Sequence, residues 1–165
     1  MTTQAVLFEE EQSFGAAWWG LMLGILGFVA AIFTSIAVLE PEKAGSLIGS
    51  GILAFVVFGG VTLLLYMTKL TVRVDSETMH VSYFPFFKKD IPLTDIAHWE
   101  ARTYRPLVEY GGWGIRSSWG GKNSAYNLKG NRGVQLEFAN GKRLLIGSQR
   151  AEELAEAITQ AKTQV

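Results

Sequence analysis

Two long apolar runs dominate the first half of the chain. Residues 14–39 and residues 44–68 contain no charged side chain. A helix needs about 20 apolar residues to cross the hydrocarbon of a bilayer, so each run is long enough to span it. A signal peptide would begin with a basic segment, whereas three glutamates, residues 9–11, precede the first run. The pattern therefore predicts two transmembrane helices.

The connection between the two runs is only "EPEK", residues 40–43. So short a loop predicts an antiparallel hairpin with both ends on one side of the membrane. The loop offers one basic residue, Lys43, whereas four follow the second run closely: Lys69, Arg73, Lys88 and Lys89. Because basic residues gather on the cytoplasmic side, we expect both termini in the cytoplasm and the hairpin in the inner membrane.

Glycines recur within both runs at a spacing of four residues: Gly20 and Gly24, then Gly45 and Gly49. Small residues at this spacing let helix backbones approach closely. They predict either packing of the hairpin against itself or self-association of copies in the bilayer. Neither run holds an ionisable residue, so we do not expect the hairpin alone to transport ions.

The second half alternates between apolar and polar residues, which is typical of strands. In "KLTVRVDSETMHVSYF", residues 69–84, two such runs flank the turn signal "DSET" and predict a hairpin. Pro92 predicts an edge position or a strand end, because proline cannot donate to a neighbouring strand.

A second hairpin is expected where "VQLEF" and "KRLLI" flank "ANG", residues 139–141. A two-residue turn would place polar side chains opposite apolar ones. A three-residue loop instead places Leu136 opposite Leu144, with Val134 and Ile146 as the next pair on that face. It also puts the glycine of the loop at the left-handed position, so we predict this loop.

The chain closes with a predicted helix in "SQRAEELAEAITQAK". Ser148 can cap it, and Glu152 and Glu153 complement the dipole of its first turn. Its apolar stripe follows helical spacing: Ala151, Leu154, Ala155, Ile158 and Ala161. With about seven short strands before the helix, we predict an α+β domain, a partly open barrel closed by a C-terminal helix.

The organisation is therefore an acidic tail (1–13), a transmembrane helical hairpin (14–68) and a cytoplasmic domain (69–165). The runs "LTVRVDSETMHVSYF", "DIPLTDIAHW" and "GVQLEFANGKRLLIGSQRAEELAEAI" resemble bacterial pleckstrin-homology-like (PH-like) domains. The resemblance implies two bent antiparallel sheets, a C-terminal helix that caps them and a membrane-attached binding or assembly module. Phosphoinositide binding through a basic first hairpin is not carried over, because "DSET" is acidic.

Motifs for catalysis are not found. The glycine-rich run 110–133 fails as a phosphate loop, because Arg116 replaces a required glycine and Asn123 replaces the final Ser or Thr. It fails as a dinucleotide fingerprint at Ser117. Neither histidine has a second ligand at metal-binding spacing, and there is no cysteine. We therefore expect no enzyme activity, cofactor, metal or nucleotide.

Charge is balanced over the chain, with 15 Lys or Arg and 15 Asp or Glu, so a nucleic-acid partner is not expected. Residues 101–135 nevertheless hold six basic residues and one acid. The glycines and tryptophans there predict either a curved, packed sheet or a positive face. As a binding face its candidates are Arg102, Arg105, Trp113, Arg116, Trp119, Lys122, Lys129 and Arg132.

The function expected from these patterns is a non-enzymatic interaction or assembly module at the inner membrane. It would associate with itself or with other membrane proteins. The alternative is a module that binds anionic lipid headgroups through the basic segment 102–132.

Overall fold

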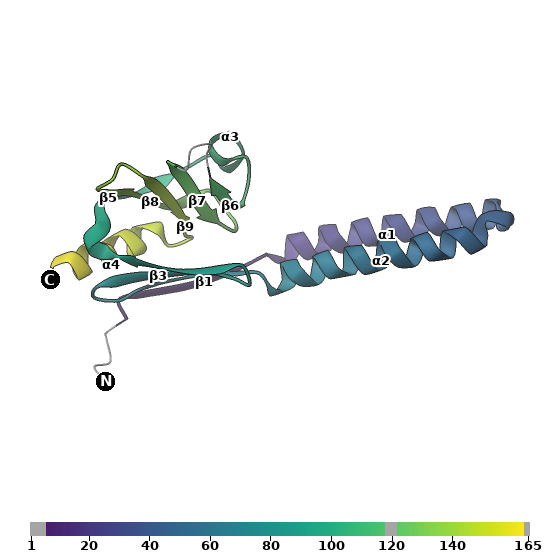
Figure 1. Cartoon of the computed structure of the whole chain (residues 1–165), viewed down its shortest axis with the longest axis horizontal. Coiled ribbons are helices and arrows are strands. Elements are labelled where there is room, and N and C mark those ends of the chain that lie inside the picture. The colour runs from purple at the N-terminus through teal and green to yellow at the C-terminus, as the bar shows by residue number, and fades with distance from the viewer. Residues whose placement is uncertain (1–5, 118–121, 164–165) are drawn as a thin grey trace. The chain divides into compact units, whose positions relative to one another are not determined.

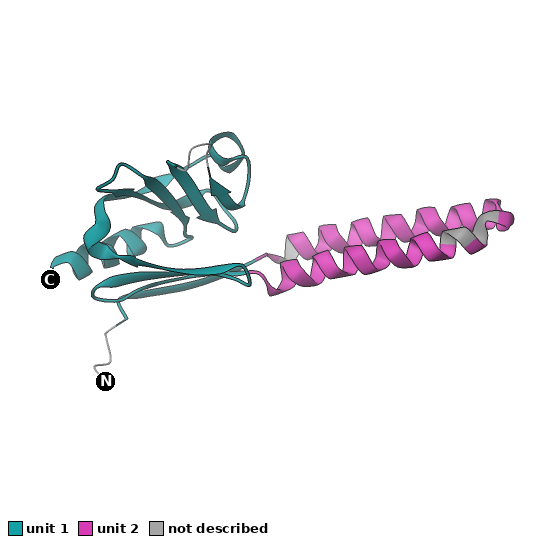
Figure 2. Cartoon of the chain, in the orientation of Figure 1, with its two compact units in different colours: residues 1–13, 69–165 teal, residues 14–68 magenta. Residues whose placement is uncertain are grey.

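The computed structural model describes residues 6–117 and 122–163. The chain divides into two compact units (Figure 2), one made of residues 14–68 and the other of residues 1–13 together with 69–165. The second unit therefore contains segments from both sides of the hairpin in the sequence.

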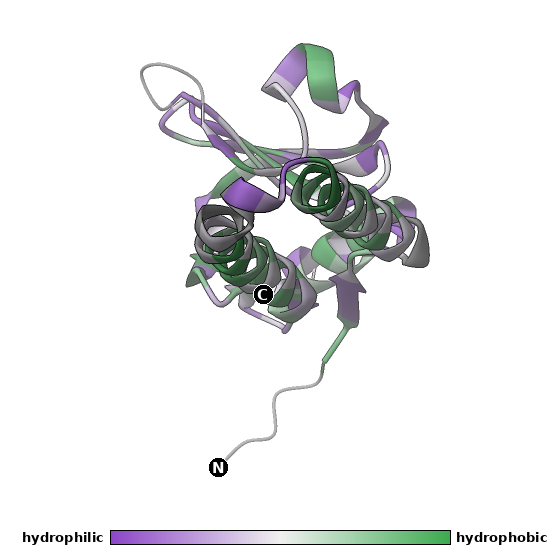
Figure 3. Cartoon of the chain, turned by 90° about the vertical axis from the view of Figure 1, so that its right-hand side faces the viewer, coloured by the Kyte–Doolittle hydropathy of each residue, from purple (hydrophilic) through white to green (hydrophobic). Residues whose placement is uncertain are grey.

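The unit of residues 14–68 consists of two long helices, α1 (Ala16–Leu39) and α2 (Ala44–Met67), joined by the short 3₁₀ helix η1 (Pro41–Lys43). Hydrophobic residues extend along both helices (Figure 3). The stretches Trp18–Leu39 and Ile48–Met67 are long and apolar enough to cross a membrane, and neither is buried within the structure. Two apolar helices with a short connection are thus confirmed, and they favour association with a membrane.

The space beside each of the paired glycines is open. A Cβ atom added at Gly20, Gly24, Gly45 or Gly49 would meet no described atom within 4 Å. At Gly51, by contrast, it would lie 3.6 Å from the Phe33 ring. In this structure, therefore, packing within the hairpin does not depend on the four predicted glycines, and self-association through them stays a prediction.

The other unit contains two sheets (Figure 1). The first sheet is antiparallel, with the order β1-β2-β3-β4: β1 Phe8–Ser13, β2 Lys69–Val74, β3 Thr78–Phe84 and β4 Phe87–Pro92. The second has the order β5-β8-β9-β7-β6: β5 Ile96–Thr103, β6 Gly114–Ser117, β7 Asn123–Asn127, β8 Arg132–Phe138 and β9 Arg143–Gly147. Three helices complete the unit: η2 Leu93–Asp95, α3 Pro106–Tyr110 and α4 Ala151–Thr163.

The topology differs from the predicted one in two ways. Within the described part of residues 69–165 there are eight strands, β2–β9, where about seven were expected, and β1 adds a further strand from before the hairpin. The sheets are not wholly antiparallel, because β7 pairs with β9 in parallel. The sheet-rich domain with a C-terminal helix is confirmed.

Residues 8–13 of the predicted acidic tail form a strand, because β1 pairs with β2 along six positions from Phe8↔Val74 to Ser13↔Lys69. The side chains of Phe8, Glu10 and Gln12 are buried on one face, and those of Glu9, Glu11 and Ser13 are exposed. The first sheet is therefore built from chain on both sides of the hairpin.

The β8–β9 hairpin has the predicted three-residue loop. Leu136 pairs with Leu144, and Val134 pairs with Ile146. Gly141 has a φ angle of 74°, and its N–H donates to the carbonyl of Phe138 at 2.9 Å. The first predicted hairpin also forms, as β2 and β3, and Pro92 ends the edge strand β4.

Helix α4 lies between the two sheets and contacts strands of both (Figure 1). Before its first residue, the Ser148 hydroxyl oxygen accepts the N–H of Arg150 at 3.0 Å. The buried residues of the helix are Ala151, Leu154, Ala157, Ile158 and Ala161. Ala155, predicted in this stripe, is only half-buried, and Ala157 takes its place. The apolar side chains of both sheets complete this core around α4.

Candidate functional site

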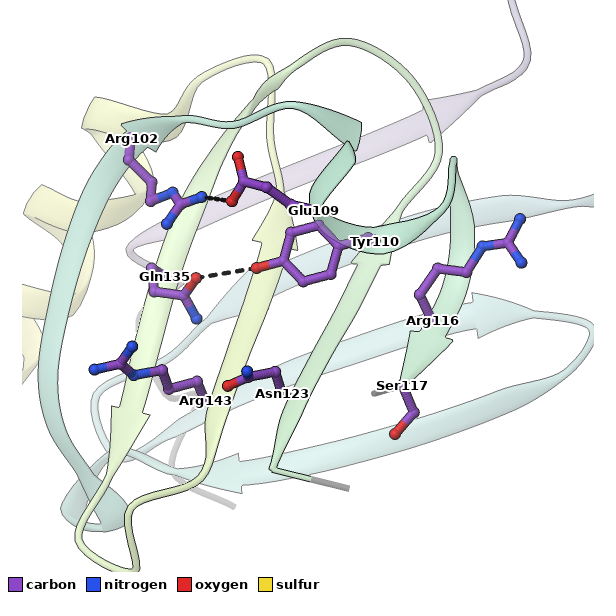
Figure 4. Close-up of a pocket in the computed structure, with 8 residues that line it drawn as sticks. All are labelled: Arg102, Glu109, Tyr110, Arg116, Ser117, Asn123, Gln135 and Arg143. Atoms are coloured by element: carbon purple, nitrogen blue, oxygen red, sulfur yellow. Dashed lines mark hydrogen bonds and ion pairs between the residues drawn. The ribbon is translucent and has the colours of Figure 1, made fainter. Parts of the chain in front are cut away.

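A polar pocket lies on the face of the second sheet that points away from α4. Side chains alternate between the two faces of a strand; Leu136 and Leu144 point into the core, so Gln135 and Arg143 point to the other face. The pocket has a volume of about 430 Å³ and is shown in Figure 4. We call it the arginine pocket, and its lining is Arg102, Glu109, Tyr110, Arg116, Ser117, Asn123, Gln135 and Arg143.

The strand register brings these residues together from distant parts of the sequence. One row across the sheet runs from Gln135 to Leu145, then Ala125 and finally Arg116. In the next row, Arg143 pairs with Asn123. The β5 and α3 residues form the remaining wall (Figure 4).

An aromatic cluster supports the base of the pocket. Tyr104, Ala125 and Leu145 are buried together, and Tyr110 packs against them. The Tyr110 ring meets the Tyr104 ring edge-on, with 6.0 Å between centroids. Short helix α3 ends at Gly111, whose φ of 69° is a left-handed conformation that glycine adopts readily. This ending places Tyr110 over the sheet.

The three arginines of the pocket differ in their partners. Arg102 pairs with Glu109, and the Arg143 Nε atom lies 2.8 Å from the Glu137 carboxylate. Arg116 donates from Nε to the carbonyl of Trp113 at 3.2 Å, and no carboxylate of the described chain pairs with it. The lining side chains hold three arginines and one glutamate, and Glu137 beside Arg143 adds a second carboxylate, so the local excess is one positive charge.

Gln135 gives the pocket an unsatisfied hydrogen-bond donor. Its side chain is only 5% exposed, and its Oε1 atom accepts a hydrogen bond from the Tyr110 hydroxyl at 3.2 Å. A phenol is protonated at neutral pH and can donate, and burial raises the pKa of Tyr110 further. Among the residues that the structure describes, the Gln135 Nε2 atom has no hydrogen-bond partner, and it points toward Arg143 and Asn123 (Figure 4).

An unpaired buried amide destabilises a protein by about 1–3 kcal/mol, so an acceptor that enters the pocket would relieve this penalty. Guanidinium groups also donate and never accept. The arrangement therefore suits a small group rich in acceptor oxygens and negative charge, such as a carboxylate or a phosphate. Tyr110 offers an apolar surface beside it.

The basic residues predicted from the sequence do not form one site. Arg102 and Arg116 line the pocket. The Trp113 indole donates to the carbonyl of Gly130 at 2.8 Å, and Arg132 pairs with Glu152. The side chains of Arg105 and Lys122 are exposed and that of Lys129 is half-buried, all outside the pocket lining. Trp119 lies outside the described residues.

Six lining residues were not among the predicted ones: Glu109, Tyr110, Ser117, Asn123, Gln135 and Arg143. The charge excess that pointed to Arg102 and Arg116 came from a continuous segment. Gln135 ends that segment, and Arg143 follows the predicted hairpin loop. The predicted register of this hairpin puts Gln135 and Arg143 on the face opposite Leu136 and Leu144. This register was the sequence signal that could have identified them as pocket residues.

The two histidines lie outside the pocket. The His80 ring lies between two carboxylates, with Nδ1 2.6 Å from Asp90 and Nε2 3.2 Å from Asp75. His98 is exposed on β5. Within residues 6–117 and 122–163, no group of three His, Cys, Asp or Glu side chains is arranged to hold a metal ion.

Comparisons of the chain with protein-family models, with characterised proteins and with solved structures found no match.

Proposed function

We propose that this chain is a membrane-anchored, non-enzymatic binding module that holds an acidic group of a protein partner in the arginine pocket. The observation that carries the proposal is the buried Gln135 amide, whose unpaired donor points into a pocket with three arginines. Arg116, which pairs with no carboxylate among the described residues, and the free Gln135 donor favour an anion with several acceptor oxygens.

Membrane anchoring by α1 and α2 is part of this proposal. Both helices are apolar and unburied, and the β1–β2 pairing requires residues 8–13 and 69–74 to lie on the same side of any membrane that the hairpin crosses. The excess of basic residues after α2 supports a cytoplasmic location at the inner membrane of a bacterium.

A PH-like identity for the domain also stays a proposal. Two sheets and the C-terminal helix α4 support it. The additional strand β1 and the parallel β7–β9 pair would then be departures from that fold.

A protein carboxylate is favoured over a lipid headgroup because of where the pocket lies in its unit. The chain leaves for the hairpin at Ser13 and returns at Lys69, both in the first sheet. The pocket lies on the second sheet, on the face that points away from the core between the sheets. We therefore assign lipid binding to a separate surface.

Binding of an acidic peptide by the full chain tests the proposal. The chain is placed in nanodiscs of zwitterionic lipid, and its affinity for a fluorescent hexaglutamate probe is measured. A hydrogen bond to a charged group contributes about 1.5–3 kcal/mol, so Arg116→Gln should weaken binding roughly tenfold or more. Lys142→Gln removes the same charge at an exposed loop residue outside the pocket and should leave the affinity nearly unchanged.

If Arg116→Gln and Lys142→Gln weaken peptide binding equally, only the net charge of the chain matters for affinity. The arginine pocket would then not be the binding site. Nanodiscs with anionic lipid distinguish a protein carboxylate from a lipid headgroup as the ligand of the pocket. If anionic lipid displaces the peptide from the wild-type chain through the same Arg116-dependent site, the headgroup is the ligand and the protein-partner proposal fails.

A further inference from the structure

Exposed apolar side chains gather where the two sheets meet. Phe84 ends β3 and is 45% exposed, and Phe86 lies in the β3–β4 turn and is 54% exposed. Ile115 on β6 is 42% exposed. Ring contacts through Tyr83 connect Phe86 with the half-buried Phe87 and Tyr126. Phe84 is beside Tyr83 in the chain, and its side chain points to the other face of β3. We call these five residues (Phe84, Phe86, Phe87, Ile115 and Tyr126) the aromatic edge.

Ring contacts hold the aromatic edge in place. Phe87 stacks on Tyr83 with 6.1 Å between centroids and meets the Tyr126 ring at 4.8 Å. Tyr126 pairs with Ile115 across β7 and β6, so their side chains share one face. The Phe86 N–H donates to the carbonyl of Tyr83 at 2.8 Å and closes the turn. The exposed rings are thus presented by a fixed support.

Covalent connection places this edge close to the end of helix α2. Phe84 pairs with Lys69, the first residue of β2, and only Thr68 separates Lys69 from Met67, the last residue of α2. Two peptide steps reach about 7.6 Å at most, and paired residues of neighbouring strands lie about 5 Å apart. The Phe84 Cα atom therefore lies within roughly 13 Å of the Met67 Cα atom, whichever way the two units are oriented.

Basic residues continue from the aromatic edge. Lys88 and Lys89 follow Phe87 on the edge strand β4, and both are exposed. Lys69 is less available, because its Nζ atom lies 2.7 Å from the Glu11 carboxylate. Exposed aromatic rings beside lysines are the composition of surfaces that lie at the boundary of a bilayer with anionic lipids.

We propose that the aromatic edge inserts into the interfacial layer of the same membrane that the hairpin crosses, with Lys88 and Lys89 at the anionic headgroups. This rests on the proposed membrane anchoring. The domain is then held at the membrane by the neighbouring β1–α1 and α2–β2 connections and also at the aromatic edge, which restricts its rotation about the connections. The arginine pocket lies on the other face of β6, because Ile115 and Arg116 are neighbours on this strand and their side chains point to opposite faces.

Site-directed spin labelling of the full chain in anionic nanodiscs tests this proposal. Because the sequence has no cysteine, each variant carries one label: Phe86→Cys and Ile115→Cys on the edge, and Glu77→Cys as the control. Glu77 is exposed in the turn at the other end of β2 and β3. Collision rates of the nitroxide with oxygen, which concentrates in lipid, and with a water-soluble nickel chelate report its depth.

The ratio of oxygen to nickel collisions should be several-fold higher at positions 86 and 115 than at position 77. Exchange of Lys88 and Lys89 for glutamine should lower this ratio at position 86, because the attraction to anionic headgroups is lost. Equal ratios at positions 86 and 77 would overturn the proposal.

A label in the middle of α2, introduced as Val57→Cys, distinguishes failure of the aromatic edge proposal from failure of the membrane anchoring on which it rests. If the nitroxide at position 57 is in lipid while positions 86 and 115 are in water, the hairpin spans the membrane and only the aromatic edge proposal fails. If position 57 is itself in water, membrane anchoring fails and the edge proposal falls with it.

Discussion

Burial of the Tyr83 phenol couples the stability of the domain to pH. The side chain is only 3% exposed, and burial raises its pKa from 10.0 to about 12, although the nearby Arg116 charge opposes this. In the unfolded chain the phenol ionises near pH 10. The contribution of the neutral phenol to stability is therefore complete below pH 10 and is lost as the pH rises toward 12.

We expect the free energy of unfolding to fall between pH 10 and pH 12, and Tyr83→Phe to reduce the slope of this fall. Burial also raises the pKa of Tyr104, Tyr110 and Tyr126, so part of the slope remains in the variant. Urea unfolding of the full chain in detergent, followed by circular dichroism at several pH values, measures it. An unchanged slope in Tyr83→Phe would contradict the prediction.

Single residues of the arginine pocket show what sequence alone can reveal. Arg102 and Arg116 were predicted because basic residues are concentrated in their segment. Gln135 and Asn123 carry no charge and match no motif, and their role depends on neighbours across the sheet. The unpaired Gln135 donor in particular is a property of tertiary packing, which no local pattern encodes.

Among the elements, β1 is a strand that the pattern of apolar and polar residues does not predict. Its buried face carries Phe8, Glu10 and Gln12, so apolar and polar residues do not alternate. The Glu10 carboxylate accepts hydrogen bonds from the Ser148 hydroxyl and from the Gln149 N–H, the latter at 2.9 Å. The Gln12 amide donates to the carbonyl of Gly147 at 2.9 Å. Hydrogen bonds, rather than apolar burial, attach this face to the segment before α4.

Glu10→Ala should therefore destabilise the domain by about 1–3 kcal/mol, because it leaves the donors of Ser148 and Gln149 unpaired. Glu11→Ala is the matched control on the same strand. Its carboxylate pairs with Lys69 on the surface, so its loss should change stability by less than about 1 kcal/mol. Urea midpoints compare the two, and equal effects would show that β1 contributes little through Glu10.

The β8–β9 hairpin is the opposite case. Its apolar residues alternate, and its loop contains a glycine where a left-handed residue is required. Pattern and turn chemistry agree, so even its register could be predicted. The parallel pairing of β7 with β9 could not, because it joins a strand from before the hairpin to one within it, and no turn fixes that register.

At the scale of the whole molecule, the glycines of the hairpin predict self-association. Gly45 and Gly49 form a small-residue pair four positions apart on α2, and a Cβ atom added at either would meet no described atom within 4 Å. Gly45→Leu with Gly49→Leu should lower the fraction of dimers in mild detergent, because backbones could no longer approach closely. Gly60→Leu is the control, since Val56 and Leu64 flank it at that spacing. A monomer at every concentration in the unaltered chain would refute self-association.

The position of the whole chain across a membrane follows from the β1–β2 pairing and can be tested directly. Because β1 and β2 belong to one sheet, Glu9 and Lys142 must face the same compartment. If both helices span the membrane, Glu42 in the connection between α1 and α2 must face the opposite compartment.

We expect a membrane-impermeant maleimide added to intact cells to label Glu42→Cys but neither Glu9→Cys nor Lys142→Cys. In permeabilised cells, all three variants should be labelled. All three residues are exposed, so protection from the reagent reports the membrane rather than burial. Labelling of all three in intact cells would contradict the spanning hairpin, whereas labelling of Glu9→Cys and Lys142→Cys alone would keep the hairpin and reverse its orientation.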